Sequence, residues 1–189
     1  MTAIVGVIAS FFLMLKSDFL KAAGPRRWGN AVFIIALALL IASLSLAAAA
    51  GHWFTVAFPL RVLFILLAAL AAWLEAVSLF WALPARETYL GGRETALVDR
   101  GMYALCRHPG ALWLPLLLLS LALALGSAGL LWAGAVASVL NAVYVLIQDR
   151  WVFPKTIPGY AEYQTATPFL IPTRASLKRA LDTTRHRQE

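Results

Sequence analysis

The sequence predicts an all-α, polytopic membrane helix bundle with about five transmembrane helices. Hydrophobic residues make up 61% of the 189 residues and charged residues only 13%, whereas soluble domains carry about 25% charged residues. The mean hydropathy is +0.78, and several apolar runs approach the roughly 20 residues that a helix needs to cross a bilayer. The Lys and Arg residues are gathered between these runs.

The first three helices are predicted from separate apolar runs. They are expected at residues 2–15, 31–50 and 58–83. Pro84 is expected to end the third helix, because proline disrupts a helix interior. The first run is short, so its helix would tilt or thin the bilayer locally.

The fourth and fifth helices are predicted from one charge-free run over residues 108–148. The sequence Gly-Ser-Ala-Gly at 126–129 interrupts this run, and such glycine and serine clusters are typical of turns. We therefore expect a C-terminal helical hairpin whose two ends return to the same side of the membrane. An aromatic segment over 148–172 follows and is expected to pack on the cytoplasmic membrane face.

The whole chain is interpreted as a single integral-membrane domain. In its basic tail, Leu177 and Leu181 stand four residues apart among Lys and Arg. This spacing is typical of a short interfacial helix on anionic lipid, and a frayed, solvated terminus fits it equally well. The domain, residues 1–189, divides into a three-helix part (1–96), a motif region (97–172) and the basic tail (173–189).

The placement of Lys and Arg indicates the orientation. They occur in the segment 16–30, after the third helix and in the tail, but not in the two other turns. Cytoplasmic loops carry an excess of Lys and Arg, so we expect the N-terminus outside and the C-terminus in the cytoplasm of a bacterial inner membrane. The net charge of +7 then reflects loops near anionic headgroups, and membrane lipids rather than nucleic acid are the expected partners. The basic residues of the two charged loops are Lys16, Lys21, Arg26, Arg27, Arg86, Arg93, Arg100 and Arg107.

Two polar segments flank the predicted hairpin: "LVDRGMYALCRHPGAL" at 97–112 and "QDRWVFPKTIPGYAEYQTATPFLIP" at 148–172. The first resembles the Arg-His-Pro signature of integral-membrane methyltransferases, which include isoprenylcysteine carboxyl methyltransferases and phospholipid N-methyltransferases. The second is similar to the closing segment of that superfamily. Two such motifs in order, separated by a hairpin, are more specific than one alone.

The resemblance implies that the chain binds S-adenosylmethionine at the cytoplasmic ends of the last helices. It implies methyl transfer to a lipophilic acceptor, such as a prenylcysteine carboxylate or a phospholipid amine. It implies catalytic roles for Arg107 and Asp149. The cofactor-binding residues that it implies are Gly101, Tyr103, Arg107, His108, Pro109, Gln148, Asp149 and Tyr160.

The residue types agree with such a site. Because the hairpin returns to one side, the segment 107–109 is expected beside the segment 148–150. Arginine grips a carboxylate in bidentate fashion, and the ring of Tyr103 offers a face to a cation. Methyl transfer from a sulfonium needs positioning and exclusion of water rather than a catalytic triad.

Plainer roles remain open for several of these residues. Arg107 fits a membrane anchor that extends to the headgroups, and Asp149 fits an ion pair with Arg150 at a helix end. Tyr160 fits an aromatic residue of the membrane interface. The lone Cys106 is expected to pack, and no metal site is expected.

Four residues are expected around a substrate cavity: Glu75, Ala111, Trp113 and Asn141. Glu75 falls inside the third apolar run, where an acidic side chain is costly and marks a functional site by default. The alternative is a polar pair with Asn141. Ala111 and Trp113 stand where the superfamily has Tyr and Gly, and Gln148 stands where it has Glu, so the contacts with substrate and cofactor differ from its pattern.

Two other functions compete with methyl transfer. An NADPH-dependent membrane reductase of sterol-reductase type has a similar Arg-His-Pro and a late acidic-basic pair, although the chain has no G-x-G-x-x-G fingerprint. A non-catalytic, degenerate relative would also explain the departures at Ala111, Trp113 and Gln148.

Overall fold

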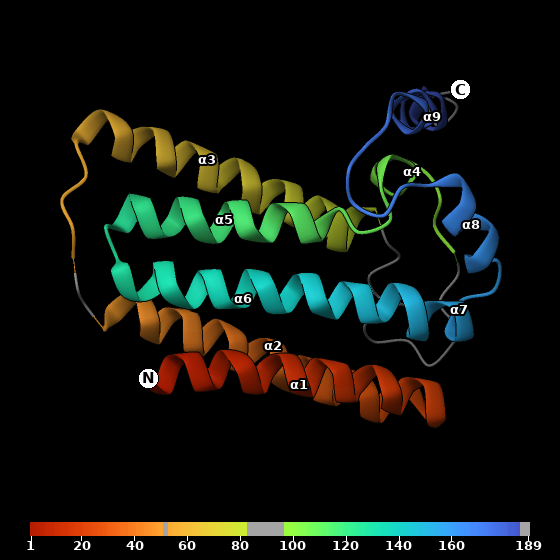
Figure 1. The fold of residues 1–189 in the computed structure, drawn as a ribbon, viewed down its shortest axis with the longest axis horizontal. Helices are drawn as coiled ribbons and strands as arrows, with labels where there is room; N and C mark the ends of the chain where they lie inside the picture. The colour runs from red at the N-terminus through yellow and green to blue at the C-terminus, as the bar shows by residue number, and fades with distance from the viewer. Residues whose placement is uncertain (51–52, 83–96, 186–189) are drawn as a thin grey trace.

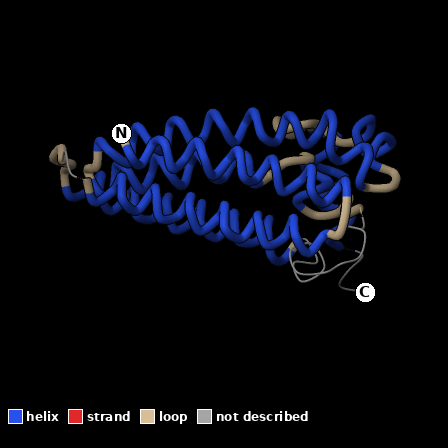
Figure 2. Tube along the Cα trace, turned by 90° about the horizontal axis from the view of Figure 1, so that it is seen from below, coloured by secondary structure: helices blue, strands red, loops and turns tan. Residues whose placement is uncertain are grey.

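The long helices of the computed structural model run side by side as one bundle (Figure 1). The structure describes residues 1–50, 53–82 and 97–185, and within these ranges it contains helices and no strand (Figure 2). The loops gather at the two ends of the bundle (Figure 2). The predicted all-α class is therefore confirmed.

The chain forms long membrane-length helices first and short helices near its C-terminus. The elements in order are α1 (Thr2–Ala23), α2 (Arg26–Ala49), α3 (Phe58–Ala76), η1 (Val77–Trp81), α4 (Met102–Leu105), α5 (Gly110–Leu125), α6 (Ala128–Ile147), η3 (Gln148–Val152), α7 (Phe153–Thr156), α8 (Tyr160–Ala166) and α9 (Arg174–Arg185); η1 and η3 are π-helical turns.

Four helical segments are long and apolar enough to cross a membrane. A fifth, α5, is an apolar helix of 16 residues, which falls short of the roughly 20 residues of an ordinary span. The chain is thus an integral membrane protein, a polytopic helix bundle as the sequence predicts. The four longer segments are Thr2–Ala23, Arg26–Ala49, Phe58–Trp81 and Ala128–Thr156.

The first connection is much shorter than predicted. Residues 16–30, expected as a charged loop, are almost entirely helical, because α1 continues to Ala23 and α2 begins at Arg26. The apolar run ends at Lys16, but Lys, Ala and Leu are good helix formers, so the helix continues until Gly24 and Pro25 interrupt it. With 22 residues, α1 is long enough to cross a bilayer of ordinary thickness.

The helix α6 lies in the middle of the bundle, where it contacts α5 on one side and the pair α1 and α2 on the other. The helix α3 packs against the far side of α5 (Figure 1). Small residues at these interfaces let the helices approach closely. The buried core residues are Val7, Phe11, Met14, Ala36, Leu40, Ala47, Leu118, Ala133 and Ala137.

A tight turn joins α5 to α6 and confirms the predicted hairpin. Gly126 ends α5 in the left-handed conformation, with φ at 67°, which glycine adopts without strain. A Cβ atom at this position would collide with the backbone carbonyl oxygen of Phe54. Ser127 then caps α6, because its hydroxyl accepts a hydrogen bond of 3.2 Å from the N–H of Leu130.

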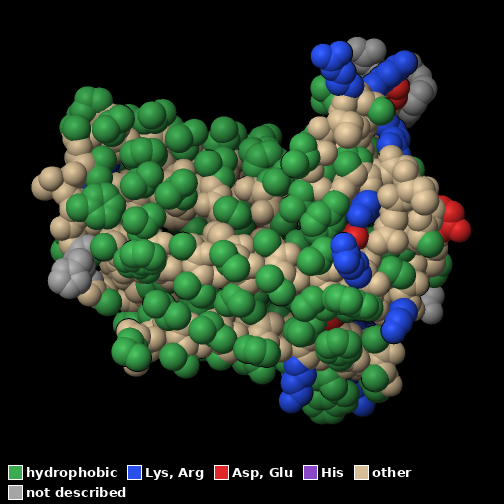
Figure 3. Space-filling view, viewed as in Figure 1, with side chains coloured by type: hydrophobic (Ala, Val, Ile, Leu, Met, Phe, Trp, Pro, Cys, Tyr) green, Lys and Arg blue, Asp and Glu red, His purple; other side chains and the backbone are tan. Residues whose placement is uncertain are grey.

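Lys and Arg side chains gather at one end of the bundle, whereas hydrophobic side chains cover its length (Figure 3). At this basic end α1 turns into α2, α5 begins, and the short helices α7, α8 and α9 lie (Figure 1). The predicted helix terminator Pro84 and the predicted loop residues Arg86 and Arg93 lie outside the described residues.

Candidate functional site

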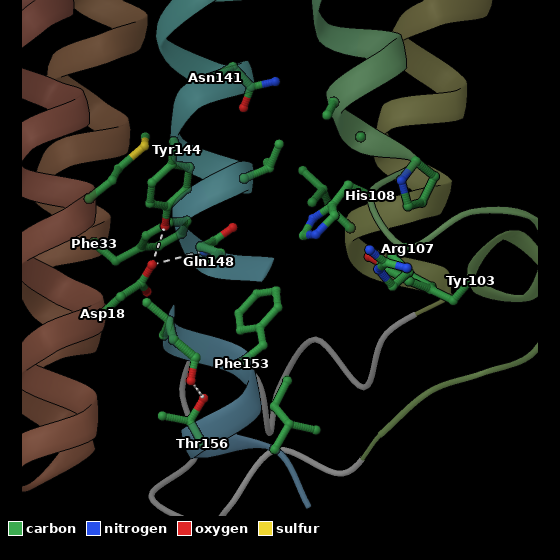
Figure 4. A pocket seen from close by; sticks show the side chains of 18 of the residues that line it. Asp18, Phe33, Tyr103, Arg107, His108, Asn141, Tyr144, Gln148, Phe153 and Thr156 are labelled. Carbon is green, nitrogen blue, oxygen red and sulfur yellow. Dashed lines mark hydrogen bonds between the residues drawn. The ribbon is translucent and has the colours of Figure 1, made fainter. Parts of the chain in front are cut away.

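A cavity of about 330 Å³ lies at the basic end of the bundle. Side chains from α1 and α2 form one wall, and side chains from α3, α5 and the segment before α5 form the other, with α6 between them (Figure 4). The sequence-predicted site residues that line it are Glu75, Tyr103, Arg107, His108, Pro109, Ala111, Asn141, Gln148 and Tyr160.

An ion pair between Arg107 and Asp149 joins the two predicted motifs. Nε and Nη2 of Arg107 donate to the two carboxylate oxygens of Asp149 at 2.7 and 2.9 Å, which is the bidentate geometry that gives strong pairing. The two side chains are only 11% and 6% exposed. Nη1 of Arg107 donates to the carbonyl oxygens of Gln164 and Thr167 at 3.0 and 2.5 Å. The pair therefore fastens the segment before α5 to η3 and to the end of α8.

Asp149 accepts three further hydrogen bonds. Nε2 of His108 lies 3.2 Å from Oδ1, the hydroxyl of Tyr160 donates to the same oxygen at 2.8 Å, and Nε2 of Gln164 donates to Oδ2 at 3.2 Å. A carboxylate only accepts, so His108 donates through Nε2. We call Arg107, His108, Asp149, Tyr160 and Gln164 the clamp.

Four of the residues that the resemblance assigns to the ligand form hydrogen bonds with one another in the clamp, namely Arg107, His108, Asp149 and Tyr160. The donors of Arg107 meet Asp149 and the backbone, and the oxygens of Asp149 meet protein donors. Burial lowers the pKa of Arg107, but the hydrogen bond and the negative charge of Asp149 outweigh burial and hold this pKa above its ordinary value. In this structure the pair holds the cavity wall in shape.

Aromatic rings form much of the wall around the clamp. The ring of His108 stacks on Phe153 with centroids 5.8 Å apart, and Tyr103 and Tyr160 line the cavity. Burial, and then the hydrogen bond to Asp149, raises the pKa of Tyr160 far above its ordinary value, so its hydroxyl stays protonated. Ring faces of this kind suit a bound cation.

Glu75 adds a carboxylate beside the start of α5. A Cβ atom at Gly110 would lie 3.2 and 3.3 Å from its two carboxylate oxygens, so the glycine makes room for the acid. Oε2 of Glu75 is buried and has no hydrogen-bond partner among the described residues. Asn141 also lines the cavity, and its amide points into it (Figure 4). The predicted alternative, a pair between Glu75 and Asn141, is not formed between these two described residues.

The opposite wall holds a carboxylate that no sequence motif assigns to the site. Asp18 of α1 is 6% exposed and accepts hydrogen bonds from the hydroxyl of Tyr144 at 2.7 Å and from Nε2 of Gln148 at 2.9 Å (Figure 4). Nζ of Lys21, about one helical turn after Asp18, lies 3.8 Å from Oδ1 of Asp18. The three-residue spacing of Asp18 and Lys21 pairs side chains on a helix, and it is the signal that could have revealed them.

The π-helical turn η3 directs two neighbouring residues to opposite walls. Gln148 reaches Asp18 of α1, whereas Asp149 reaches Arg107. Single π-helical turns are rare and occur frequently at functional sites. The two adjacent residues that the resemblance assigns to the cofactor therefore support different walls of the cavity.

Three predicted site residues do not line the cavity. Gly101 precedes α4 with φ at 58°, and its N–H donates to Oγ1 of Thr183 in α9 at 3.2 Å. Trp113 is half-buried in α5, and its Nε1 has no hydrogen-bond partner among the described residues. Asp149 is buried and forms hydrogen bonds with Arg107 and His108, which do line the cavity.

The described residues contain no group of three or more His, Cys, Asp and Glu side chains that could hold a metal ion. The lone Cys106 is buried. Burial raises the pKa of its thiol to about 11, although the backbone N–H of His108 lowers it in part. The thiol is therefore protonated near neutral pH, as a packing residue would be.

Comparison with known proteins gives no match. No protein-family model matches the chain, no curated protein matches it, and no solved structure matches it.

Proposed function

We propose that the chain is a membrane-embedded methyltransferase that transfers a methyl group from S-adenosylmethionine to a lipid-borne or otherwise apolar acceptor. The observation that carries the proposal is the cavity at the basic end of the bundle. Its lining combines the carboxylates of Asp18 and Glu75 with the cations of Lys21 and Arg26, aromatic rings and an apolar remainder. The segments that resemble the methyltransferase superfamily meet in its wall.

The residues present fit an amino-acid-bearing sulfonium cofactor. The cavity volume of about 330 Å³ falls in the range of roughly 300–1,000 Å³ that is usual for small-molecule sites. Lys21 would meet the cofactor's carboxylate, and the rings of Tyr103 and Phe153 would face its sulfonium. The clamp would keep this wall in position, a supporting role for Arg107 and Asp149.

Glu75 and Asn141 are the proposed acceptor-side residues. When bound, S-adenosylmethionine would supply an electrophilic methyl carbon. The chain's own task is to align the acceptor's nucleophile with that carbon, to exclude water and to let the demethylated thioether product leave. When the acceptor is an amine, the chain must also take up the proton that the methylated amine releases, whereas a carboxylate acceptor releases none. The unpartnered Oε2 of Glu75 is suited to this proton, and Asn141 would orient the acceptor. Phe11 and Met14, which line the cavity, would contact its hydrocarbon part.

The proposal includes an orientation. The basic end would face the cytoplasm of a bacterial inner membrane, where a soluble and charged cofactor reaches the cavity directly. The acceptor would come from the bilayer, since apolar side chains cover the length of the bundle (Figure 3).

The direct test is methyl transfer into lipid. Protein reconstituted in vesicles is incubated with S-adenosylmethionine carrying a radiolabelled methyl group and with a membrane lipid extract, and the organic phase is then counted and fractionated. The proposal predicts a labelled lipid-soluble product that heat-denatured protein does not form. NADPH oxidation is followed with the same extract in parallel. Oxidation without label transfer would point to a reductase, and the absence of both would point to a non-catalytic protein.

A further inference from the structure

The C-terminal helix α9 begins with a reciprocal pair of side-chain caps. The backbone N–H of Ser176 donates to Oγ1 of Thr173 at 3.1 Å, and the backbone N–H of Thr173 donates to Oγ of Ser176 at 2.9 Å. This arrangement satisfies backbone donors at the start of the helix, as a capping box does. The basic tail is therefore a capped helix up to Arg185 rather than a frayed terminus.

The inner face of α9 forms hydrogen bonds with segments next to the candidate site. Arg179 donates from Nη1 to Oγ1 of Thr167 at 3.3 Å and from Nη2 to the carbonyl oxygen of Ala166. Thr183 accepts a hydrogen bond of 3.2 Å from the N–H of Gly101. The helix is thus held against α4 and against the end of α8. Thr167, the residue that follows α8, also accepts a hydrogen bond from Arg107 through its carbonyl oxygen. The position of α9 relative to the cavity is defined by these contacts.

The outer face of α9 combines exposed leucines with basic side chains. Leu177 and Leu181 are 51% and 55% exposed, and at a spacing of four residues they lie on one face. Arg174 and Lys178 are exposed beside them, three residues before each leucine. Exposure of leucine side chains to water is unfavourable. A row of leucines with basic residues at its edge is instead typical of a helix that lies at the boundary between headgroups and acyl chains.

The helix also lies where a membrane surface would meet the bundle. Figure 1 looks almost along α9, whereas the long helices run across the picture, so α9 lies crosswise to the bundle at its basic end. In Figure 3, hydrophobic side chains lie on the flank of α9 that is turned toward the apolar length of the bundle, with Lys and Arg side chains beside them. A helix in this position runs along the membrane face and not through it.

We propose that the outer face of α9 binds the anionic lipid headgroups of the membrane face at the basic end of the bundle. Leu177 and Leu181 enter the boundary of the acyl chains, and Arg174 and Lys178 pair with lipid phosphates, because an anionic surface attracts basic side chains close to it. Through Thr183 and Gly101 the lipid surface then fixes α4 as well. This binding does not depend on the proposed methyl transfer.

Fluorescence of a single label tests the proposal on the full chain. The environment-sensitive dye NBD is attached to Leu181→Cys in a Cys106→Ser background. The matched control carries the dye at Glu162→Cys, an exposed position on α8. Both proteins are reconstituted into nanodiscs of neutral phosphatidylcholine, and into nanodiscs that also contain anionic phosphatidylglycerol.

The expected result is emission at shorter wavelength from position 181 in the anionic discs than in the neutral ones, with quenching by nitroxide-labelled lipid. The control at position 162 should show water-like emission in both. The double substitution Arg174→Glu and Lys178→Glu should abolish the anionic-specific shift.

Water-like emission from position 181 in the anionic discs overturns the proposal and points to a protein partner for this face. An equal shift in the neutral discs overturns the part assigned to charge. The dye at Leu177→Cys repeats the measurement if the first variant does not fold.

Discussion

One carboxylate holds three segments of the chain together at the clamp. Asp149 of η3 pairs with Arg107 and His108 from the segment before α5, and with Tyr160 and Gln164 from α8. Removing only its charge would leave a buried guanidinium without a counter-ion. Leaving a buried charge without its partner lowers the free energy of unfolding by more than removing a charge from an exposed position.

We therefore expect Asp149→Asn to destabilise the protein by about 3–5 kcal/mol, the range for breaking a buried pair from one side. Differential scanning fluorimetry in detergent would show a clearly lower midpoint of unfolding. Arg150→Gln, at the exposed neighbouring position, is the matched control and should change stability by less than about 0.5 kcal/mol. Similar shifts for the two variants would contradict the buried pair.

Glu75 should matter to the reaction and not to the fold. Glu75→Gln keeps the shape of the side chain but cannot take up a proton, so the proposed methyl transfer to an amine acceptor should slow by about 10²-fold or more. The midpoint of unfolding should not fall, because Oε2 has no partner to lose. Glu162→Gln, at an exposed position of α8, should transfer methyl groups at the wild-type rate. An unchanged rate for Glu75→Gln would remove Glu75 from the mechanism.

At the residue scale, the sequence predicts the wall with Arg107 and Asp149 better than the wall with Asp18. The hairpin predicts that the segments 107–109 and 148–150 meet, and Arg107 and Asp149 are indeed 2.7 Å apart. The three-residue spacing of Asp18 and Lys21 predicts a local pair on α1. It does not predict the partners Tyr144 and Gln148, because they lie on α6 and η3, far along the chain. The hydrogen bonds from Nη1 of Arg107 to the carbonyl oxygens of Gln164 and Thr167 likewise depend on how α8 and the residue after it fold back.

At the element scale, hydropathy predicts which helices exist but not where they end. An apolar run marks the part of a helix that fits the bilayer, whereas the helix itself ends where its backbone is interrupted. For this reason α1 continues past Lys16 to Ala23 and stops only before Gly24 and Pro25. The π-helical turns have no hydropathy signal and were not predicted.

The turn of the hairpin gives an element-scale prediction. Gly126→Ala should destabilise the protein by more than about 1 kcal/mol, because Gly126 has φ at 67° and lacks space for a Cβ atom beside Phe54. Gly24→Ala is the control at another helix end, since Gly24 is extended, with φ at −168°, and has room. The midpoints of unfolding in detergent compare the two variants. A cost at Gly24 equal to that at Gly126 would contradict the role of the turn.

At the scale of the whole molecule, the gathering of Lys and Arg at one end (Figure 3) predicts the orientation in the membrane. In intact cells, a membrane-impermeant maleimide should label Thr55→Cys at the opposite end and should label Lys155→Cys only after permeabilisation, both in a Cys106→Ser background. The two positions are exposed and described, so their different labelling would report the side of the membrane. The reverse pattern would place the cavity outside the cell and contradict the proposed access of the cofactor.

If the proposed function is right, the cavity between the two walls binds S-adenosylmethionine, and calorimetric titration of the purified protein measures this binding. We expect saturable binding of S-adenosylmethionine and of its demethylated product with one site per chain. This binding should be weakened in Lys21→Ala, and NADPH should not bind. Heat of binding from NADPH alone, or from none of the three compounds, would contradict the proposed cofactor site.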